Sequence, residues 1–304
     1  IAGQLKAGTA TPKARAEALA FFRSGRVPAP SMKRLEELLH DPPSDPQTRI
    51  LGVAGYPCAH SKGPTLFNGL FAEYGLNCFY TLFEDPELAQ IMNVAKSIGA
   101  KGLSVTIPFK QDVIKFCDEV DEHAAQQIGA VNTVVFACGS AIGYNTDWLG
   151  IRKPLVGMKG AKVVLLGAGG VASAAAYALK DLDMDVTILN RTPDRAKELA
   201  KRFDCRWAAW DTFDTIRPDL VVNTTPLGME PDPRSPLASE QLYPELTVYD
   251  LVYTPPITPL IEMARAKGCT TITGTGLFLE QAKEQFYLWF GIDVPEETLR
   301  KYLP

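Results

Sequence analysis

The fold is decided by the stretch Val163-Val164-Leu165-Leu166-Gly167-Ala168-Gly169-Gly170-Val171-Ala172-Ser173-Ala174-Ala175. An apolar strand runs through a glycine turn into an alanine-rich helix, so the first N–H groups of the helix face whatever lies beyond the strand. The pattern is GxGGxA, a variant of the GxGxxG fingerprint in which Ala172 still allows close packing of the helix. It predicts that a pyrophosphate binds at the turn residues Gly167, Ala168, Gly169, Gly170 and Val171. Packing without any ligand is the alternative.

Around this stretch, strands alternate with helices along most of the chain. Downstream, apolar segments near residues 163, 186, 220, 248 and 271 are separated by helical segments, which predicts a parallel, doubly wound Rossmann-type sheet. Upstream, a second alternating series begins at Ile50 and ends near residues 150–160. The sequence therefore predicts an α/β protein with two lobes, and an N-terminal appendage or linker over residues 1–48.

The end of the second Rossmann strand bears on the type of dinucleotide. An NAD site places an acidic residue there for the ribose 2′-hydroxyl, whereas this sequence has Asn190, Arg191, Thr192 and, further on, Arg195. Two arginines can hold a 2′-phosphate through bidentate, charged hydrogen bonds. The sequence therefore favours NADP. The alternative is a solvated helix start in which Arg195 pairs with acidic neighbours.

Composition excludes several classes of protein. The chain has 304 residues, of which 46% are hydrophobic and 22% charged, with a net charge of -4. These values fit a globular protein rather than a disordered or membrane-embedded one, and no positive field favours nucleic acid or a membrane as partner. Six cysteines without a CxxC pair and three histidines without an HxxxH pair predict reduced thiols and no metal. We expect a cytoplasmic location, or a plastid if a transit peptide preceded Ile1.

Three polar turns in the first lobe follow strands and are candidate sites for small polar ligands. They span residues 55–64, 104–110 and 143–147. Hydroxyl and backbone donors at a helix start suit a carboxylate or a phosphate. If the strand ends converge, Lys110 and Asp147 form a proton-relay pair, although a lone lysine on a loop is usually solvated.

A series of short motifs in order along residues 50–290 resembles the shikimate dehydrogenase family. The motifs are GxPxxHS at 55–61, VTIPFK at 105–110, GAVNT at 129–133, GYNTD at 143–147, GAGG at 167–170, NRT at 190–192, NTTPLGM at 223–229, DLVY at 250–253 and QA at 281–282. Each motif is short, but agreement of the whole ordered series by chance is negligible.

The resemblance implies reversible, NADPH-dependent reduction of 3-dehydroshikimate to shikimate, with Lys110 and Asp147 as the catalytic pair. The lysine would stabilise the developing oxyanion and supply its proton, and Asp147 would hold both the lysine and the hydroxyl. The resemblance also implies that a C-terminal helix returns to the first lobe. The expected domains are therefore 49–155 with 276–304 for the substrate, and 156–275 for NADP.

The same motif matches imply the other site residues. Ser61 would bind the substrate carboxylate, in one turn with Gly63. The rest of the substrate pocket would be formed by Thr106, Asn132, Asp147, Tyr253, Gln281 and Gln285. The nicotinamide side would be lined by Met229, Leu251 and Gly274. Without the family, the two glutamines read as solvated helix residues and Tyr253 as part of the core.

Two departures from the family pattern affect the substrate pocket. The family usually has Ser-x-Ser at the carboxylate turn, but the second serine is Gly63 here, and a position that is commonly Asn is Ser104. We expect that Gly63 leaves space beside the ring carbon that carries the carboxylate, enough to admit quinate. Shikimate remains the better expected substrate.

Three alternatives remain open at this stage. The chain could be a quinate dehydrogenase or a dual quinate and shikimate dehydrogenase. It could also be a non-catalytic metabolite sensor with the same fold, although such a protein would be expected to lose Lys110 and Asp147. Residues 1–5 weakly resemble the end of a dehydroquinate dehydratase, so a fusion to that enzyme is a further expectation.

Overall fold

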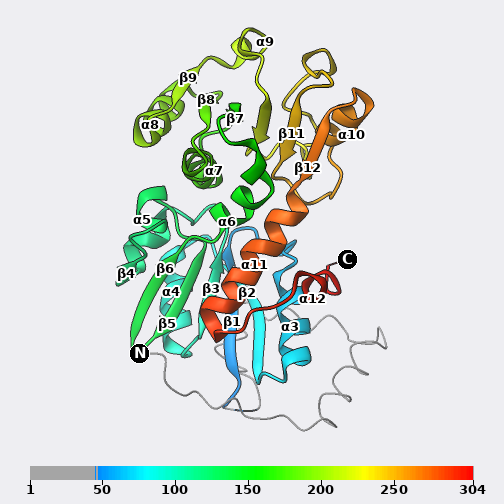
Figure 1. Ribbon diagram of the computed structural model, residues 1–304. Coiled ribbons are helices and arrows are strands. Elements are labelled where there is room, and N and C mark those ends of the chain that lie inside the picture. Colours follow the sequence, from blue (N-terminus) through cyan, green and yellow to red (C-terminus); the bar gives the residue numbers. More distant parts are fainter. Residues whose placement is uncertain (1–44, 46, 304) are drawn as a thin grey trace. The chain divides into compact units, whose positions relative to one another are not determined.

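The structure is a computed structural model that describes residue 45 and residues 47–303. Packing divides these residues into two compact units (Figure 1). Unit 1 comprises the described part of 1–119 together with Thr133–Gly143 and residues 294–303. Unit 2 comprises Val120–Asn132 and Tyr144–Asp293. The predicted appendage 1–48 lies outside the described residues, apart from positions 45, 47 and 48.

Unit 1 is built on a six-stranded mixed sheet in the order β2-β1-β3-β5-β6-β4. The strands are β1 (Arg49–Gly55), β2 (Cys78–Glu84), β3 (Gly102–Val105), β4 (Glu119–Val120), β5 (Thr133–Ala137) and β6 (Ser140–Tyr144). β1 is parallel to both β2 and β3, while β5 runs antiparallel to β3. Parallel neighbours need crossover helices, and the chain supplies these between β1, β2 and β3.

The helical segments of unit 1 are α3 (Gly63–Tyr74), α4 (Leu88–Ser97), the 3-10 helix η1 (Asp112–Phe116) and α12 (Glu296–Arg300). α3 begins with Pro64 in its first turn and ends at Gly75, whose φ of 63° is the left-handed conformation that glycine adopts readily. Its buried face includes Leu66, Phe67 and Leu70. The polar turn that follows β1 leads directly into the first residues of α3.

Unit 2 is built on a six-stranded, wholly parallel sheet in the order β12-β11-β10-β7-β8-β9. The strands are β7 (Lys162–Leu166), β8 (Asp185–Leu189), β9 (Arg206–Ala208), β10 (Leu220–Asn223), β11 (Thr247–Asp250) and β12 (Thr270–Thr273). This is the Rossmann order, in which the direction of winding reverses between β7 and β10. Ligands of such sheets bind beyond the carboxyl ends of the strands at this reversal.

The helical segments of unit 2 fall into long helices and single turns. The long helices are α7 (Gly170–Asp181), α8 (Pro193–Phe203), α10 (Pro259–Ala266) and α11 (Gly274–Phe290). The short ones are α5 (Ala125–Ile128), α6 (Asp147–Arg152), η2 (Lys153–Met158), η3 (Trp210–Thr212), α9 (Phe213–Ile216) and η4 (Ser239–Gln241). No helix among residues 47–303 is long and apolar enough to cross a bilayer.

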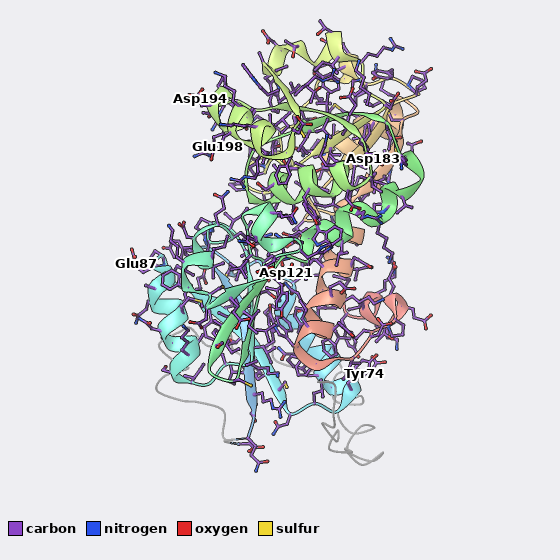
Figure 2. The ribbon with its side chains drawn as sticks, turned by 60° about the vertical axis from the view of Figure 1, so that its left-hand side comes forward. Tyr74, Glu87, Asp121, Asp183, Asp194 and Glu198 are labelled. Atoms are coloured by element: carbon purple, nitrogen blue, oxygen red, sulfur yellow. The ribbon has the colours of Figure 1, made fainter. Side chains whose placement is uncertain are left out.

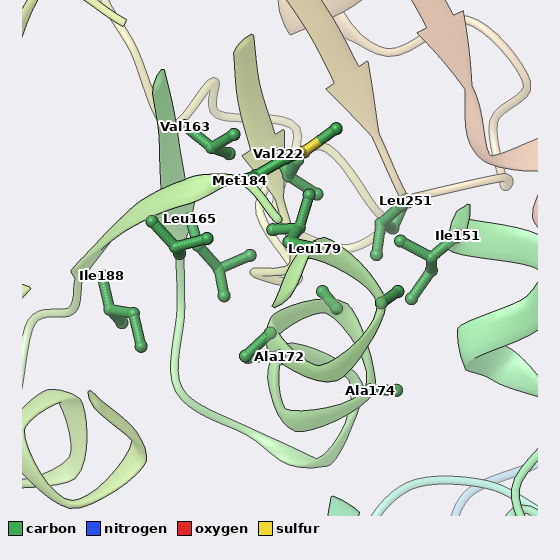
Figure 3. Packing of buried hydrophobic residues seen from close by; sticks show 14 of the residues in the cluster. Ile151, Val163, Leu165, Ala172, Ala174, Leu179, Met184, Ile188, Val222 and Leu251 are labelled. Carbon is green, nitrogen blue, oxygen red and sulfur yellow. The ribbon is translucent and has the colours of Figure 1, made fainter. Parts of the chain in front are cut away.

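The main core of unit 2 lies between β7 and α7 (Figure 3). Val163 and Leu165 point from β7 toward Leu179 of α7, and Ala172 and Ala174 present only methyl groups on the helix. Small side chains allow a helix to approach a sheet closely, which fixes where the helix begins. The alanine-rich sequence of α7 thus lets this helix pack closely within the core.

The α/β class and the two alternating series are confirmed, with local differences. The predicted helix separating the strands near 220 and 248 is wrong, because that connection contains only the 3-10 turn η4. β4 and β9 were not predicted, since two and three residues are too short for a visible alternation. Residues 144–155 and α11 pack within unit 2, whereas the predicted substrate domain includes them, because α6 packs against both α7 and α11.

Candidate functional site

The turn after β7, residues 167–170, is called the cofactor turn here. Gly167 has a φ of 111°, and a Cβ at this position would lie 2.5 Å from Thr224 Oγ1. Its N–H donates to the Leu189 carbonyl at 2.8 Å, and Thr224 Oγ1 donates to the Leu166 carbonyl at 2.6 Å. Both the backbone conformation and the close approach require glycine at 167.

The opposite side of the cofactor turn is open. Gly169 is the residue before α7, and a Cβ there would meet nothing within 4 Å. Ala168, Gly170 and Val171 are half-buried, so none of the predicted turn residues beyond Gly167 is sealed in the core. An open glycine cradle at the start of a twelve-residue helix fits the pyrophosphate of a dinucleotide.

The end of β8 provides the second part of a dinucleotide site. Asn190 Nδ2 donates to the Thr192 carbonyl at 2.9 Å, which shapes the turn into α8. Arg191 and Arg195 are exposed, and among residues 47–303 neither is paired with an acidic side chain. Two unpaired guanidinium groups at this place fit a phosphate better than a ribose hydroxyl.

The acidic residues of α8 have other partners. Asp194 Oδ1 lies 3.2 Å from Lys197 Nζ, and Glu198 Oε1 lies 4.0 Å from Arg202 Nη2. Figure 2 shows Asp194 and Glu198 projecting from α8 on the outer side of unit 2. Among residues 47–303, Arg195 therefore lacks the acidic partner that the alternative interpretation gave it, although it is as solvated as that interpretation expects.

The three residues predicted on the nicotinamide side belong to the loops after β10 and β11 and to the start of α11. The Leu251 N–H donates to the Asn223 carbonyl at 3.0 Å, and the Leu251 side chain is buried. A Cβ on Gly274 would lie 2.4 Å from the Leu251 carbonyl oxygen, so these two residues are in close contact. Met229 is half-buried in the loop after β10. Their contacts with a nicotinamide stay predictions.

A buried carboxylate holds these loops, and sequence analysis missed it. Asp250 is fully buried and accepts hydrogen bonds from Asn223 Nδ2 at 2.9 Å, Thr258 Oγ1 at 2.6 Å and the Val252 N–H at 3.1 Å. Burial raises the pKa of Asp250, against the lowering effect of its donors. The signal available in the sequence was an acidic residue at the end of an apolar strand.

Asp147, one of the predicted catalytic residues, opens α6 within a network of amides and hydroxyls. Asn132 Nδ2 donates to Asp147 Oδ1 at 2.8 Å, and it also lies 3.0 Å from Thr146 Oγ1. The side chains of Asn132 and Asp147 are only 1% and 6% exposed. A buried carboxylate needs hydrogen-bond donors of this kind, and Asn132 supplies one.

α11 completes this network with the two predicted glutamines. Thr146 Oγ1 donates to the Gln281 carbonyl at 3.1 Å, and Gln285 Nε2 donates to the Asn132 carbonyl at 3.1 Å. Gln285 is 2% exposed, so its interpretation as a solvated helix residue is wrong. The structure thus brings Asn132, Asp147 and both glutamines together, whereas their contacts with a substrate stay predictions.

Tyr253 lies near the same carboxylate. Its ring is half-buried and stacks on Phe278, with centroids 4.9 Å apart and an interplanar angle of 30°. Burial raises the pKa of Tyr253, and the negative charge of Asp147 raises it further. A protonated phenol beside Asp147 is a neutral hydrogen-bond donor for a polar ligand.

The turn before α3, residues 61–63, is called the carboxylate turn here. Ser61 is half-buried, and its Oγ accepts a hydrogen bond from the Gly63 N–H at 3.2 Å. The end of β3 lies beside the end of β1, because a Cβ on Gly55 would be 2.4 Å from Thr106 Cγ2. Lys110 follows in the turn after β3 and is half-buried. Three of the predicted substrate residues thus lie in one region of unit 1.

The expected open space beside Gly63 is wrong. A Cβ at position 63 would lie 3.0 Å from Tyr80 Cε1 and 3.2 Å from the Tyr80 hydroxyl. The ring of Tyr80 therefore occupies the place that a larger residue at 63 would take. Nothing in the sequence singled out Tyr80.

Lys110 belongs to unit 1 and Asp147 to unit 2, so each is described by its own neighbours and their pairing stays a prediction. Among residues 47–303, no cluster of three or more His, Cys, Asp or Glu side chains is arranged to hold a metal ion. The six cysteines are free thiols.

Comparison with known families gives matches along most of the described chain. A family model described as the shikimate dehydrogenase substrate binding domain matches residues 53–134. A second, described as shikimate / quinate 5-dehydrogenase, matches residues 151–221, and a third, the shikimate 5'-dehydrogenase C-terminal domain, matches residues 274–301.

Individual proteins agree with these matches. The NADP(+) shikimate dehydrogenase of Methanopyrus kandleri is 38% identical over 277 residues, covering 84% of this chain and 95% of its own. The Thermus thermophilus shikimate 5-dehydrogenase, solved with NADP(H) and shikimate, is 33% identical with a TM-score of 0.75, covering 84% and 100% of the two chains. The Corynebacterium glutamicum quinate dehydrogenase, solved with NAD, is 32% identical with a TM-score of 0.77, covering 84% and 98%.

Proposed function

Because this chain belongs to the shikimate dehydrogenase family, we propose that it catalyses the reversible, NADP-dependent interconversion of 3-dehydroshikimate and shikimate. It is an oxidoreductase that acts on a secondary alcohol of a small carboxylic acid. The observation that carries the proposal is the buried Asp147, held by Asn132 in a network that α11 completes. Such a network fixes the orientation of a carboxylate that accepts a hydrogen bond from a ligand hydroxyl.

Lys110 and Asp147 manage the proton in this proposal. The cationic Lys110 stabilises the oxygen of the substrate as negative charge develops on it, and then donates the proton that completes the alcohol. Asp147 accepts a hydrogen bond from a ring hydroxyl and fixes the substrate's orientation. NADPH, when bound, supplies the hydride to the ring carbonyl carbon. In the direction of shikimate oxidation, Lys110 takes the proton back.

The chain's own residues would bind the cofactor in two places. The open N–H groups of the cofactor turn would hold the pyrophosphate. Arg191 and Arg195 would clamp the 2′-phosphate, because their guanidinium groups are exposed and have no acidic partner within residues 47–303. Met229, Leu251 and Gly274 would line the nicotinamide.

The substrate would be held by its carboxylate and its hydroxyls. Ser61 and the backbone of the carboxylate turn would donate to the carboxylate, which is supported by the half-buried hydroxyl of Ser61. Hydroxyl contacts would come from Thr106, Asn132, Asp147, Tyr253, Gln281 and Gln285. The Gln285 amide already supports the Asn132 backbone, so its role is to hold Asn132 in place as well.

The experiment that tests the proposed function follows NADPH absorbance after NADP and shikimate are mixed with the purified chain. The proposal predicts reduction of NADP, with multiple turnovers and with loss of activity in Lys110→Ala. Binding of shikimate without any reduction of NADP would instead support a metabolite sensor. The sensor is the weaker hypothesis because both Lys110 and Asp147 are present.

The remaining alternatives are supported by fewer observations than the proposed function. Quinate dehydrogenase is not favoured as the main activity, since the open space expected beside Gly63 is filled by Tyr80. Fusion to a dehydroquinate dehydratase rests on residues 1–5, which lie outside the described residues. The cytoplasmic location remains an expectation; fractionation of the native protein tests it.

A further inference from the structure

Tyr80 lies on β2, and no residue of this strand has a role in the proposed reaction. In the parallel register, Tyr80 of β2 pairs with Leu51 of β1, and Ser104 of β3 pairs with Val53 of β1. Residues two apart on a strand share a face, and in-register neighbours on parallel strands do as well. Tyr80 and Ser104 therefore lie on the same face of the sheet, with β1 between them.

The side chain of Tyr80 crosses β1 and ends at the carboxylate turn. Its hydroxyl lies 2.6 Å from Ser104 Oγ. The Cβ position of Gly63 is 3.0 Å from Tyr80 Cε1, 3.2 Å from the Tyr80 hydroxyl and 3.2 Å from Ser61 Oγ. Ser61, Gly63, Tyr80 and Ser104 thus meet at one point, although they are distributed over 44 positions of the chain, 61 to 104.

The ring of Tyr80 is held on every side. It is 1% exposed and stacks on Phe67 of α3, with centroids 4.6 Å apart and an interplanar angle of 28°. Asn68 brackets its backbone, since Nδ2 donates to the Tyr80 carbonyl at 2.9 Å and Oδ1 accepts from the Tyr80 N–H at 2.8 Å. A ring fixed in this way cannot move aside without disturbing α3, so its hydroxyl is a fixed reference for Ser104.

We propose that Tyr80 is a positioning residue for the carboxylate end of the substrate, acting through the Ser104 hydroxyl and through the space that it fills beside Gly63. The inference rests on the proposed function, because it takes the carboxylate of a hydroxylated six-membered ring as the ligand. The two positions at which this chain departs from its family pattern, Gly63 and Ser104, both contact Tyr80, so one side chain accounts for both departures. Glycine at 63 makes room for the ring, and the short serine at 104 receives its hydroxyl.

The ordinary interpretation is that Tyr80 is a core tyrosine whose hydroxyl has simply found a partner. The two interpretations differ in what loss of the hydroxyl does. A core role changes the unfolding temperature and leaves substrate affinity unchanged. A positioning role changes KM for the substrate while kcat and KM for NADP stay near those of the wild type.

The experiment compares the full chain with Tyr80→Phe, Ser104→Ala and the double variant, using shikimate and NADP. Each single change should raise KM for shikimate by about tenfold, the loss of one well-placed hydrogen bond, with kcat within about twofold. The double variant should be no worse than the worse single variant, because the two changes break one interaction. Tyr302→Phe is the matched control: its hydroxyl donates to Glu73 at 2.7 Å in the same unit and should leave KM unchanged.

Thermal unfolding of the same four proteins separates this inference from the proposed function. The losses in unfolding midpoint for Tyr80→Phe and Ser104→Ala should not add, whether or not the chain turns over shikimate. A wild-type protein without activity would overturn the proposed function, and the role of Tyr80 would then be judged by the dissociation constant of shikimate, which both single variants should raise about tenfold. Additive losses in the midpoint, or an unchanged KM in both single variants of an active enzyme, would overturn the role of Tyr80.

Discussion

The cofactor turn and the carboxylate turn are built in opposite ways. The cofactor turn is formed by consecutive residues, and the guanidinium groups of Arg191 and Arg195, which follow β8, are exposed. The carboxylate turn depends on a fully buried tyrosine from another strand. A local glycine motif can accept the invariant part of a dinucleotide, whereas recognition of one particular acid needs side chains assembled by the sheet. The cofactor site can therefore be recognised from consecutive residues, whereas the substrate preference depends on tertiary contacts.

The largest expected effect is a loss of kcat, because it comes from residues that act in the chemical step and not from the cofactor turn. Lys110→Ala and Asp147→Asn should each lower kcat by about 10² to 10⁴-fold, because a positioned proton donor and its partner act in the transition state. KM for NADP should stay unchanged, since the cofactor turn is untouched. Steady-state kinetics measure both values, and Lys115→Ala, an exposed lysine paired with Asp112, is the matched control.

These two variants also test whether the catalytic residues act as one unit. Their effects on kcat should not multiply in the double variant. If Lys110→Ala retained more than about a tenth of wild-type kcat, Lys110 would not be the proton donor.

The next largest effect is expected at the exposed arginines. Arg191→Ala and Arg195→Ala should each lower kcat/KM with NADP by about ten- to a hundredfold, the value of a charged hydrogen bond of about 1.5 to 3 kcal/mol. The same ratio with NAD should change little, because NAD lacks the 2′-phosphate. Arg206→Ala is the control, since this arginine pairs with Asp185 at the other end of β8. Equal losses with both cofactors would mean that the arginines support the fold rather than the phosphate.

A smaller effect is expected at Gly63. The family pattern alone suggests that Gly63→Ser adds a donor and improves the use of shikimate. The structure predicts the reverse, because the new Cβ would press on the Tyr80 ring at 3.0 Å. Overpacking of about 1 kcal/mol corresponds to a loss of about fivefold in kcat/KM for shikimate. The loss should shrink in a Ser104→Ala background, where the Tyr80 ring has lost one of the contacts that hold it; a gain in the wild-type background would show that the ring moves aside easily.

The smallest effect concerns two thiols of unit 1. Burial, and then the charge of Glu84, raise the pKa of Cys58 from 9.0 to about 12, so this thiol stays protonated near neutral pH. Stability from the buried neutral thiol is present below pH 9.0 and is lost only as the pH rises towards about 12. Iodoacetamide at about pH 8 should therefore modify the exposed Cys138 and leave Cys58 intact, with activity preserved. Peptide mass spectrometry locates the adducts, and early labelling of Cys58 would show that the segment between β1 and the carboxylate turn opens.

The sequence predicted those features that depend on neighbouring residues. The strand, glycine turn and helix around Gly167 could be predicted because these three parts are consecutive in the sequence. Asn190 and Arg191 are also neighbours in the sequence, so they indicated the type of cofactor. The position of Tyr80 beside residues 63 and 104 could not be predicted, because it depends on the register of three strands and on the missing side chain at 63.

Burial explains two further misses. Gln285 and Asp250 are polar residues that solvate well on an isolated helix or strand end, and only tertiary contacts with Asn132 and Asn223 bury them. The resemblance to a known family singled out Gln285 before the structure did. Asp250 was quoted only as part of a motif, and its three hydrogen-bond donors become visible only in the fold.

The most direct test of the account is kcat/KM of the unmodified chain for shikimate and for quinate, each with NADP and with NAD. The account predicts the highest value for shikimate with NADP, about a hundredfold lower use of NAD through loss of the arginine contacts, and quinate as the poorer substrate with either cofactor. A higher value for quinate than for shikimate would contradict the matched set of Gly63, Tyr80 and Ser104. Equal values with NADP and NAD would contradict the arginine clamp.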